Sequence, residues 1–248
     1  MRLALVSDIH GNLVALDAVL DDVKRRDVDE IVCLGDLAAD GPRPHEVIKR
    51  IRCVAPTVIM GNADAMLIEP IDPELTVSST RPNAHWTIPI NRWCQEQLRM
   101  DDREYLASLP KTHSRALADD LTLFAYHGSP RSWSDNILAA TPQSQLDEWF
   151  VGSEATINVG GHTHEPLLRR DGDRMVVNPG SVGAAFDRRF LPGAFRIFPW
   201  AEYAVLNVSD TAISVEFHRV PIDLEALEDD ARASGMPCLD SWLSVWHP

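Results

Sequence analysis

The chain has 248 residues, 45% of them hydrophobic, and a formal net charge of −14. This size allows one large domain or two small ones, and the acidic balance argues against a general nucleic-acid binder, which needs a basic surface. The four cysteines form no Cys-x-x-Cys pair, which argues against disulfide staples and a structural zinc site.

The first sixty residues alternate between short apolar runs and amphipathic segments. Helical spacing of apolar residues predicts a helix over Leu13 to Arg26, with Asn12 as its N-cap, and a second helix through Val47 to Ile51. The runs that read as buried strands are Leu3 to Val6, Glu30 to Leu34 and Thr57 to Met60. Strands that alternate with helices indicate βαβ units and parallel pairing.

Residues 65–118 break this rhythm. Trp86, Trp93 and Leu98 recur at mixed helical spacing, and Leu109 precedes Pro110. We therefore expect a helical cap insertion over the strand ends, which could wall one side of a pocket.

The strand pattern returns at Leu121 to Tyr126 and at Ala155 to Val159, with a helix between them that starts at Thr141-Pro142, Thr141 being its cap. From Pro166 onward the pattern is antiparallel in character, with a hairpin turn at Asp171-Gly172. The strands expected there are Leu167 to Arg170, Met175 to Asn178, Tyr203 to Val208 and Ala212 to Val220. A closing helix from Leu224 to Ser234, capped by Asp223 and stopped by Gly235, completes a single domain over residues 1–248.

Seven potential metal ligands fall just after predicted strands, and in open α/β sheets ligands bind at the carboxyl ends of strands. They are Asp8, His10, Asp36, Asn62, His127, His162 and His164. Their mixture of oxygen and nitrogen donors suits transition metals rather than a pure magnesium or calcium site. We take two divalent ions as the cofactor, Mn first, with Fe, Zn, Ni or Co as alternatives.

These ligands lie in five blocks: Asp8-x-His10, Gly35-Asp36, Gly61-Asn62, His127, and Gly161-His162-x-His164. In this order they resemble the pattern of the calcineurin-like metallophosphoesterase superfamily, from Met1 to about Val220. The sequences His127-Gly128-Ser129-Pro130 and Asn178-Pro179-Gly180-Ser181 look most like its compact prokaryotic branch, often described as phosphodiesterases.

The resemblance implies a four-layer α/β/β/α sandwich, with two mixed sheets flanked by helices and a dimetal centre at the strand ends. It also divides the ligands. One metal takes Asp8, His10, Asp36 and His164, and the other takes the bridging Asp36 with Asn62, His127 and His162.

The mechanism inferred from this site is in-line attack on phosphorus by a metal-bridging hydroxide. Asp36 and Asn62 are the expected catalytic ligands. Asn62 has a double task, because its amide offers an oxygen to a metal and an NH₂ group to a phosphate oxygen. His10 and Asn12 are expected to contact the substrate as well, Asn12 at a helix N-terminus that favours anions.

Position 63 departs from the family pattern. Phosphomonoesterases of the superfamily usually have a His directly after the Gly-Asn asparagine, and here Ala63 stands there, followed by Asp64. Alanine cannot donate a proton. We therefore expect a phosphodiester substrate, with protonated Asp64 as one hypothesis for the missing acid.

Two alternatives remain open at this point. The same site chemistry serves a phosphomonoesterase or a protein phosphatase, and the fold also serves a non-enzymatic scaffold such as a eukaryotic sorting-complex subunit. The partner expected is a small phosphorylated substrate, with no nucleic-acid scaffold binding, no membrane association and an open oligomeric state. The absence of a signal peptide or a membrane-length apolar run makes cytoplasmic residence the expectation.

Overall fold

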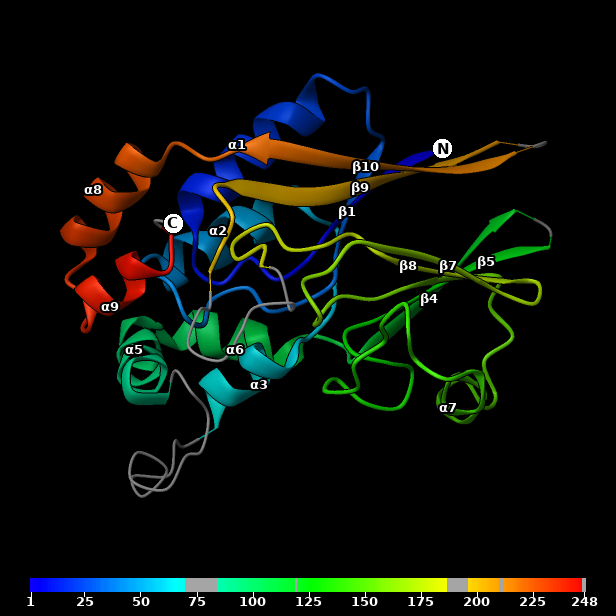
Figure 1. Cartoon of the computed structure of the whole chain (residues 1–248), viewed down its shortest axis with the longest axis horizontal. Coiled ribbons are helices and arrows are strands. Elements are labelled where there is room, and N and C mark those ends of the chain that lie inside the picture. Colours follow the sequence, from blue (N-terminus) through cyan, green and yellow to red (C-terminus); the bar gives the residue numbers. More distant parts are fainter. Residues whose placement is uncertain (70–83, 119, 187–195, 210–211, 247–248) are drawn as a thin grey trace.

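The computed structural model describes residues 1–69, 84–118, 120–186, 196–209 and 212–246. Its frame is a pair of five-stranded mixed sheets stacked face to face, with helices on their outer faces (Figure 1). This arrangement confirms the predicted four-layer sandwich. The part of the predicted cap insertion that covers residues 70–83 lies outside the described residues.

The first sheet, which we call sheet A, has the strand order β10-β9-β1-β2-β3. Its strands β1, β2 and β3 are parallel, whereas β9 and β10 form an antiparallel hairpin beside β1. The bounds are β1 Arg2–Val6, β2 Glu30–Cys33, β3 Thr57–Val58, β9 Trp200–Val208 and β10 Ile213–Pro221.

The second sheet, sheet B, has the order β4-β5-β6-β8-β7. Strands β5, β6 and β8 are parallel, and the two edge strands are antiparallel to their neighbours. The bounds are β4 Thr112–Ala118, β5 Leu121–Tyr126, β6 Ile157–Val159, β7 Leu167–Asp171 and β8 Arg174–Asn178.

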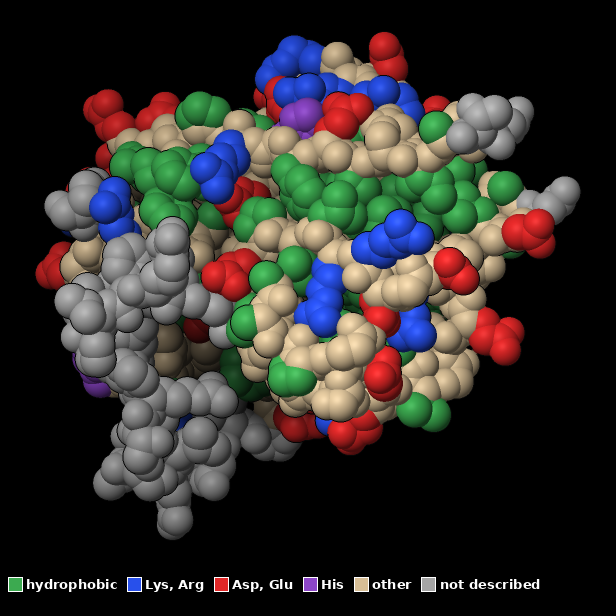
Figure 2. All heavy atoms as spheres, turned by 45° about the vertical axis from the view of Figure 1, so that its right-hand side comes forward, with side chains coloured by type: hydrophobic (Ala, Val, Ile, Leu, Met, Phe, Trp, Pro, Cys, Tyr) green, Lys and Arg blue, Asp and Glu red, His purple; other side chains and the backbone are tan. Residues whose placement is uncertain are grey.

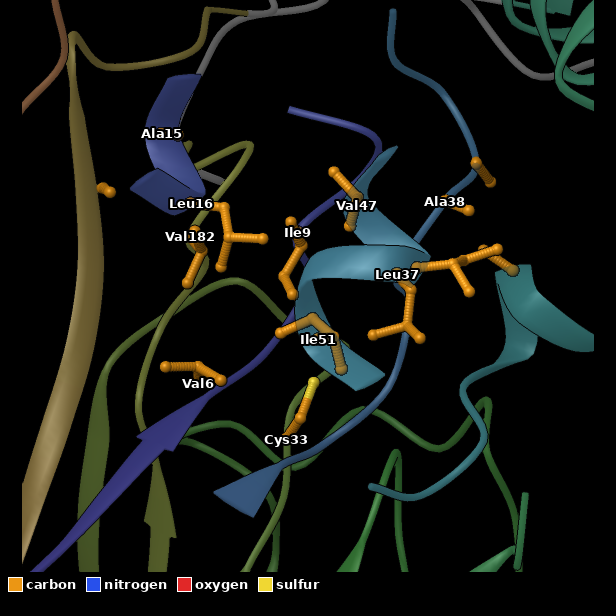
Figure 3. Packing of buried hydrophobic residues seen from close by; sticks show 14 of the residues in the cluster. Val6, Ile9, Ala15, Leu16, Cys33, Leu37, Ala38, Val47, Ile51 and Val182 are labelled. Atoms are coloured by element: carbon orange, nitrogen blue, oxygen red, sulfur yellow. The ribbon is translucent and has the colours of Figure 1, made fainter. Parts of the chain in front are cut away.

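Most of the helices pack on the sheet A side, and α7 covers the outer face of sheet B. Their bounds are α1 Leu13–Lys24, α2 Pro44–Val54, α3 Asn62–Ile68, α5 Ala84–Gln97, α6 Met100–Ser108, α7 Gln143–Trp149, α8 Leu224–Ser234 and α9 Leu239–Ser244. Figure 3 shows Val47 and Ile51 of α2 converging on Ile9 and Leu37, the residues that follow Asp8 and Asp36. The core therefore anchors the two loops that carry these carboxylates.

A separate apolar layer lies between the two sheets. It combines residues of sheet A such as Leu5 and Val32 with residues of sheet B such as Val159 and Val177. The layer reaches the surface where the edges of the sheets approach each other, and Figure 2 shows hydrophobic side chains gathered there. Strand alternation places exposed Phe217 of β10 on this inner face, because Val215, two residues before it, packs into the layer.

The structure corrects three details of the sequence prediction. Residues 112–118, expected at the end of a helical insertion, form the edge strand β4 paired with β5. The cap of α7 is Pro142 rather than Thr141, whose hydroxyl instead accepts from the Leu138 N–H, 2.9 Å away. Strand β8, expected in an antiparallel region, pairs in parallel with β6.

None of the helices in the described part of the chain is long and apolar enough to cross a membrane.

Candidate metal centre

Both sheets send side chains to one place, at the carboxyl ends of their parallel strands. Asp8 and His10 follow β1, Asp36 follows β2, and Asn62 opens α3 after β3. The other three candidate ligands come from sheet B: His127 directly after β5, then His162 and His164 after β6. All seven candidate ligands are therefore gathered where the ends of the two sheets meet.

The loops that carry these ligands are cross-linked through their main chains. The N–H groups of Ile9 and His10 both donate to the carbonyl of Asp36, at 2.9 and 3.0 Å. The Asp8 N–H donates to the Gly35 carbonyl at 3.0 Å. Five candidate ligands hold left-handed backbone conformations, with φ between 49° and 66°: Asp8, His10, Asp36, His162 and His164. Non-glycine residues seldom adopt this conformation, and it clusters at functional sites where the surroundings enforce it.

Asp8, His10 and His164 form the first group that could hold a cation. Nε2 of His10 lies 3.1 Å from Nε2 of His164, and the latter atom lies 3.4 Å from Oδ1 of Asp8. Two imidazole nitrogens that face each other beside a carboxylate oxygen match the donor set of a transition-metal site.

Asp36, His127 and His162 form the second group. Nε2 of His127 lies 3.3 Å from Oδ2 of Asp36 and 3.1 Å from Oδ1 of Asn62. Oδ2 of Asp36 also lies 3.9 Å from Nε2 of His10, in the first group. Asp36 is thus placed between the two groups, as a shared ligand requires.

Hydrogen bonds to main-chain carbonyls orient two of the histidines. Nδ1 of His127 donates to the Leu34 carbonyl at 2.7 Å, and Nδ1 of His164 donates to the Ala184 carbonyl at 2.6 Å. Each bond leaves Nε2 of the neutral ring as the ligating atom, turned toward the carboxylates.

Burial and charge set the protonation of the site. Burial lowers the pKa of His164 to about 4, which favours the neutral ligating form at pH 7. Burial disfavours the charged form of His127 as well, but the neighbouring carboxylate of Asp36 outweighs it and raises the pKa to about 10. Burial alone would raise the pKa of Asp36, yet His127 and His10 hold it below the usual carboxyl value.

The side chains fit a pair of divalent cations. Oδ1 of Asp8 is buried and has no hydrogen-bond partner, although an unpaired buried carboxylate oxygen is costly. The nearest donors to this oxygen are the ring nitrogens of the histidines, which are themselves ligand atoms. A cation between them would satisfy all of these atoms together.

Asp64 is placed differently from its predicted role as a proton donor. It is completely buried, and its carboxylate accepts main-chain N–H groups from Asp36 and Leu37, both at 2.8 Å, and from Gly61 at 3.0 Å. Burial and the charge of Asp36 raise the pKa of Asp64 to about 6. Its oxygens tie the β2 loop to the start of α3, and this placement favours a structural role for Asp64 over the predicted role as a general acid.

Asn12, expected to contact the substrate, makes two hydrogen bonds within the protein. Its Oδ1 accepts the Ala15 N–H at 3.0 Å, which confirms its prediction as the N-cap of α1. Its Nδ2 donates to the Gly183 carbonyl at 3.2 Å, and the residue is completely buried. The side chain therefore holds the β1 loop against the segment after β8.

Two glycines allow the close approach of the ligand loops. A Cβ atom at Gly61 would lie 2.1 Å from Oδ1 of Asp36, and one at Gly161 would lie 2.8 Å from Oδ2 of Asp8. The Gly-Asn and Gly-His sequences thus keep the glycine because the main chain touches the neighbouring carboxylate.

Sequence reasoning missed the surroundings of His10. Oδ2 of Asp40 lies 3.6 Å from Nδ1 of His10, and the indole N–H of Trp242 donates to the Asp40 carbonyl at 2.8 Å. No ligand spacing marks Asp40 in the sequence, because its approach to His10 depends on the path of the chain between β2 and α2.

Comparisons with known proteins agree with this geometry. A model of the calcineurin-like phosphoesterase superfamily domain matches residues 1–195. A metallophosphoesterase from Sphaerobacter thermophilus has 30% identity and a structure with a TM-score of 0.74, over 99% of this chain and 98% of that one. Phosphodiesterase YfcE of Escherichia coli is 29% identical over 73% of this chain and 79% of its own length. An uncharacterized protein of Methanocaldococcus jannaschii is 25% identical over 97% of this chain and 95% of its own length.

Proposed function

The chain belongs to the calcineurin-like phosphoesterase superfamily, and on that premise we propose that it hydrolyses a small phosphodiester with two divalent metal ions, Mn first among them. One observation carries the proposal: the two ligand groups of the centre lie side by side, with Oδ2 of Asp36 3.3 Å from His127 of its own group and 3.9 Å from His10 of the other. Bound there, the two ions supply an activated water for in-line attack and neutralise charge on the phosphate.

The roles of the individual residues follow from their contacts. Asp8, His10 and His164 would hold one ion, and Asp36, His127, His162 and Asn62 would hold the other, with Asp36 near enough to the first group to serve both ions. Asn62 is half-buried with Oδ1 beside His127, so its amide group has the donor end to offer a phosphate oxygen. His10 borders both the ligands and an adjoining cavity, which supports its expected contact with a bound substrate.

The preference for a diester rests on the side chains around α3. Ala63 is buried and its N–H donates to Oδ1 of Asp36 at 2.7 Å. Neither Ala63 nor the buried Asp64 supplies an acid for the leaving oxygen. The named activity of the relative YfcE, a phosphodiesterase, is in line with this preference.

A paired measurement tests the function. Elemental analysis after Mn reconstitution should find about two ions per chain. Turnover of bis-para-nitrophenyl phosphate should then exceed that of para-nitrophenyl phosphate. An Asp36→Asn variant should lose at least about 100-fold in turnover together with metal, because a shared ligand acts on both ions. Asp101→Asn, at an exposed side chain, is the control.

The outcomes separate the alternatives. A preference for the monoester would move the function to a phosphomonoesterase or protein phosphatase with the same site. A protein that takes up no metal and turns over neither ester would instead be read as a scaffold of this fold.

A further inference from the structure

A cavity of about 220 Å³ adjoins the first group of candidate ligands. His10 and His164 belong both to that group and to the cavity wall. A phosphate held at the metal centre therefore has this cavity beside its ester oxygens, and the organic group of the ester can enter it.

Aromatic side chains make up much of the remaining wall. Trp86 comes from α5, Trp242 from α9 and Trp246 from the segment that follows α9, and Phe186 completes the set. The three tryptophans are 7%, 3% and 2% exposed. Their indoles are fixed in the core, so the cavity is preformed and presents apolar surface.

Two polar atoms of this wall are buried without a hydrogen bond: Nδ1 of His10, which lies 3.6 Å from Oδ2 of Asp40, and Nε1 of Trp246. The indole N–H of Trp242 donates to the Asp40 carbonyl, whereas Nε1 of Trp246 is buried and has no hydrogen bond. A buried N–H group without a hydrogen-bond acceptor costs free energy. Trp246 lines the cavity, so a ligand acceptor that reaches Nε1 from there would recover this cost.

A larger cavity of about 470 Å³ lies on the other side of Phe186. None of the seven candidate ligands lines it, and its buried acid, Glu202, is already bonded to Arg219 and to the indole of Trp200. It is therefore the less suited of the two to receive part of a substrate held at the metal centre.

We propose that the cavity of Trp86, Trp242 and Trp246 binds a planar aromatic or heteroaromatic ring on the phosphate ester, with the Trp246 N–H donating to an acceptor on that ring. The proposal rests on the phosphoesterase function above and adds the chemical class of its substrate. Pockets for whole drug-sized ligands measure roughly 300 to 1,000 Å³, so this smaller cavity suits one ring system. Aromatic walls favour a ring over an alkyl chain through stacked and edge-to-face contacts.

Binding of non-hydrolysable probes tests the proposal without relying on turnover. Titration calorimetry on the Mn-loaded protein compares phenylphosphonate with methylphosphonate, and then with the three isomers of pyridylphosphonate. Phenylphosphonate should bind about tenfold more tightly than methylphosphonate, because aromatic pairs add to the area buried. At least one pyridyl isomer should bind more tightly than phenylphosphonate.

Variants separate the ring contact from the hydrogen bond. Trp86→Leu should remove most of the preference for phenyl over methyl and leave methylphosphonate binding unchanged. Trp246→Phe should keep the phenyl preference and abolish the pyridyl one. Trp149→Phe is the matched control, because Trp149 also has a buried, unpartnered indole N–H but packs between α7 and sheet B. It should change neither preference.

The results distinguish this proposal from the function on which it rests. Equal affinity of wild-type protein for phenyl and methyl probes overturns the aromatic cavity, even where bis-para-nitrophenyl phosphate is turned over. A pyridyl preference that survives Trp246→Phe overturns the assigned donor and does not depend on how Trp86→Leu folds. Tight phenylphosphonate binding without turnover of any ester supports the cavity and overturns the phosphoesterase function.

Discussion

At the scale of single residues, the centre depends on side chains that never touch a substrate. Asp64 collects three main-chain N–H groups from two loops and so fixes the position of Asp36. A buried carboxylate is stable only with such donors. Asp64, for which the sequence suggested a proton-donor role, therefore fixes the position of a metal-ligand candidate through these contacts.

Asp64→Asn tests this role. In this variant the amide has one acceptor oxygen, and its NH₂ group would face a main-chain N–H donor. The substitution should therefore lower the free energy of unfolding by about 2 to 4 kcal/mol and weaken Mn binding. Urea denaturation and Mn titration are the measurements, with exposed Asp101→Asn as control. If the variant matches wild type in stability and metal affinity while turnover alone falls, the proton-donor hypothesis returns.

Sequence alone could identify the ligands but not the role of Asp64. The blocks Asp8-x-His10 and His162-x-His164 are recognisable because residue type and spacing follow from metal chemistry. The direction in which the Asp64 side chain points is set by the meeting of two loops 28 residues apart. No local pattern encodes that meeting.

At the scale of elements, the carboxylate of Asp22 joins α1 to sheet A. Asp22 near the end of α1 accepts the Tyr203 hydroxyl of β9 at 2.6 Å and Nε of Arg26 at 2.7 Å. Burial alone would raise the pKa of Asp22, but hydrogen bonds from Arg26, Tyr203 and Arg25 lower it to about 2. Asn12 holds the other end of the same helix.

This carboxylate predicts a pH dependence of stability. A group whose folded pKa is lowered stabilises the fold above its unfolded pKa, here about 3.8, and loses that contribution as pH falls through about 2. Wild type should therefore melt at a higher temperature than Asp22→Asn at pH 6, and the gap should narrow toward pH 2. Asp21→Asn should show a smaller gap, because the Asp21 carboxylate is exposed and its hydrogen-bonded partner is the exposed Lys24. A gap that is constant with pH would contradict this assignment.

The elements themselves were predictable to different degrees. The closing helix Leu224–Ser234, its Asp223 cap and its stop at Gly235 were predicted correctly, because all three signals are local. In the structure Gly235 is left-handed. Strand β4 was missed because residues 112–118 alternate weakly and lie at the edge of sheet B, where pairing with β5 determines the strand. Helix α9 follows Pro237 after a short turn and carries no strong apolar period.

At the scale of the whole molecule, the layer between the sheets brings the two halves of the centre together. Carboxylates and the Asn62 amide come from sheet A, whereas three of the four ligand histidines come from sheet B. Neither sheet holds a complete group by itself. The packing of sheet A on sheet B therefore sets the distances between the ligand atoms of the centre.

Leu5→Ala probes this packing. Leu5 is completely buried in the layer between the sheets, so the truncation should cost about 3 kcal/mol of unfolding free energy. Leu168→Ala, at a side chain 52% exposed on edge strand β7, should cost within about 0.5 kcal/mol. Chemical denaturation measures both. Similar values for the two variants would show that the sheets are not held by this layer.

The sequence by itself determined which residues could bind metal, where most strands and helices lie, and the family to which the chain belongs, because ligand type, spacing and apolar period are local properties. Only the tertiary structure decided how sheets A and B stack and that Asp36 lies between the two ligand groups. It alone decided that Asp64 and Asn12 are buried and bonded within the protein, and that indoles from α5 and the C-terminal segment meet beside His10. The physical reason is that these contacts join residues far apart in the chain, and each exists only when the core has placed both partners.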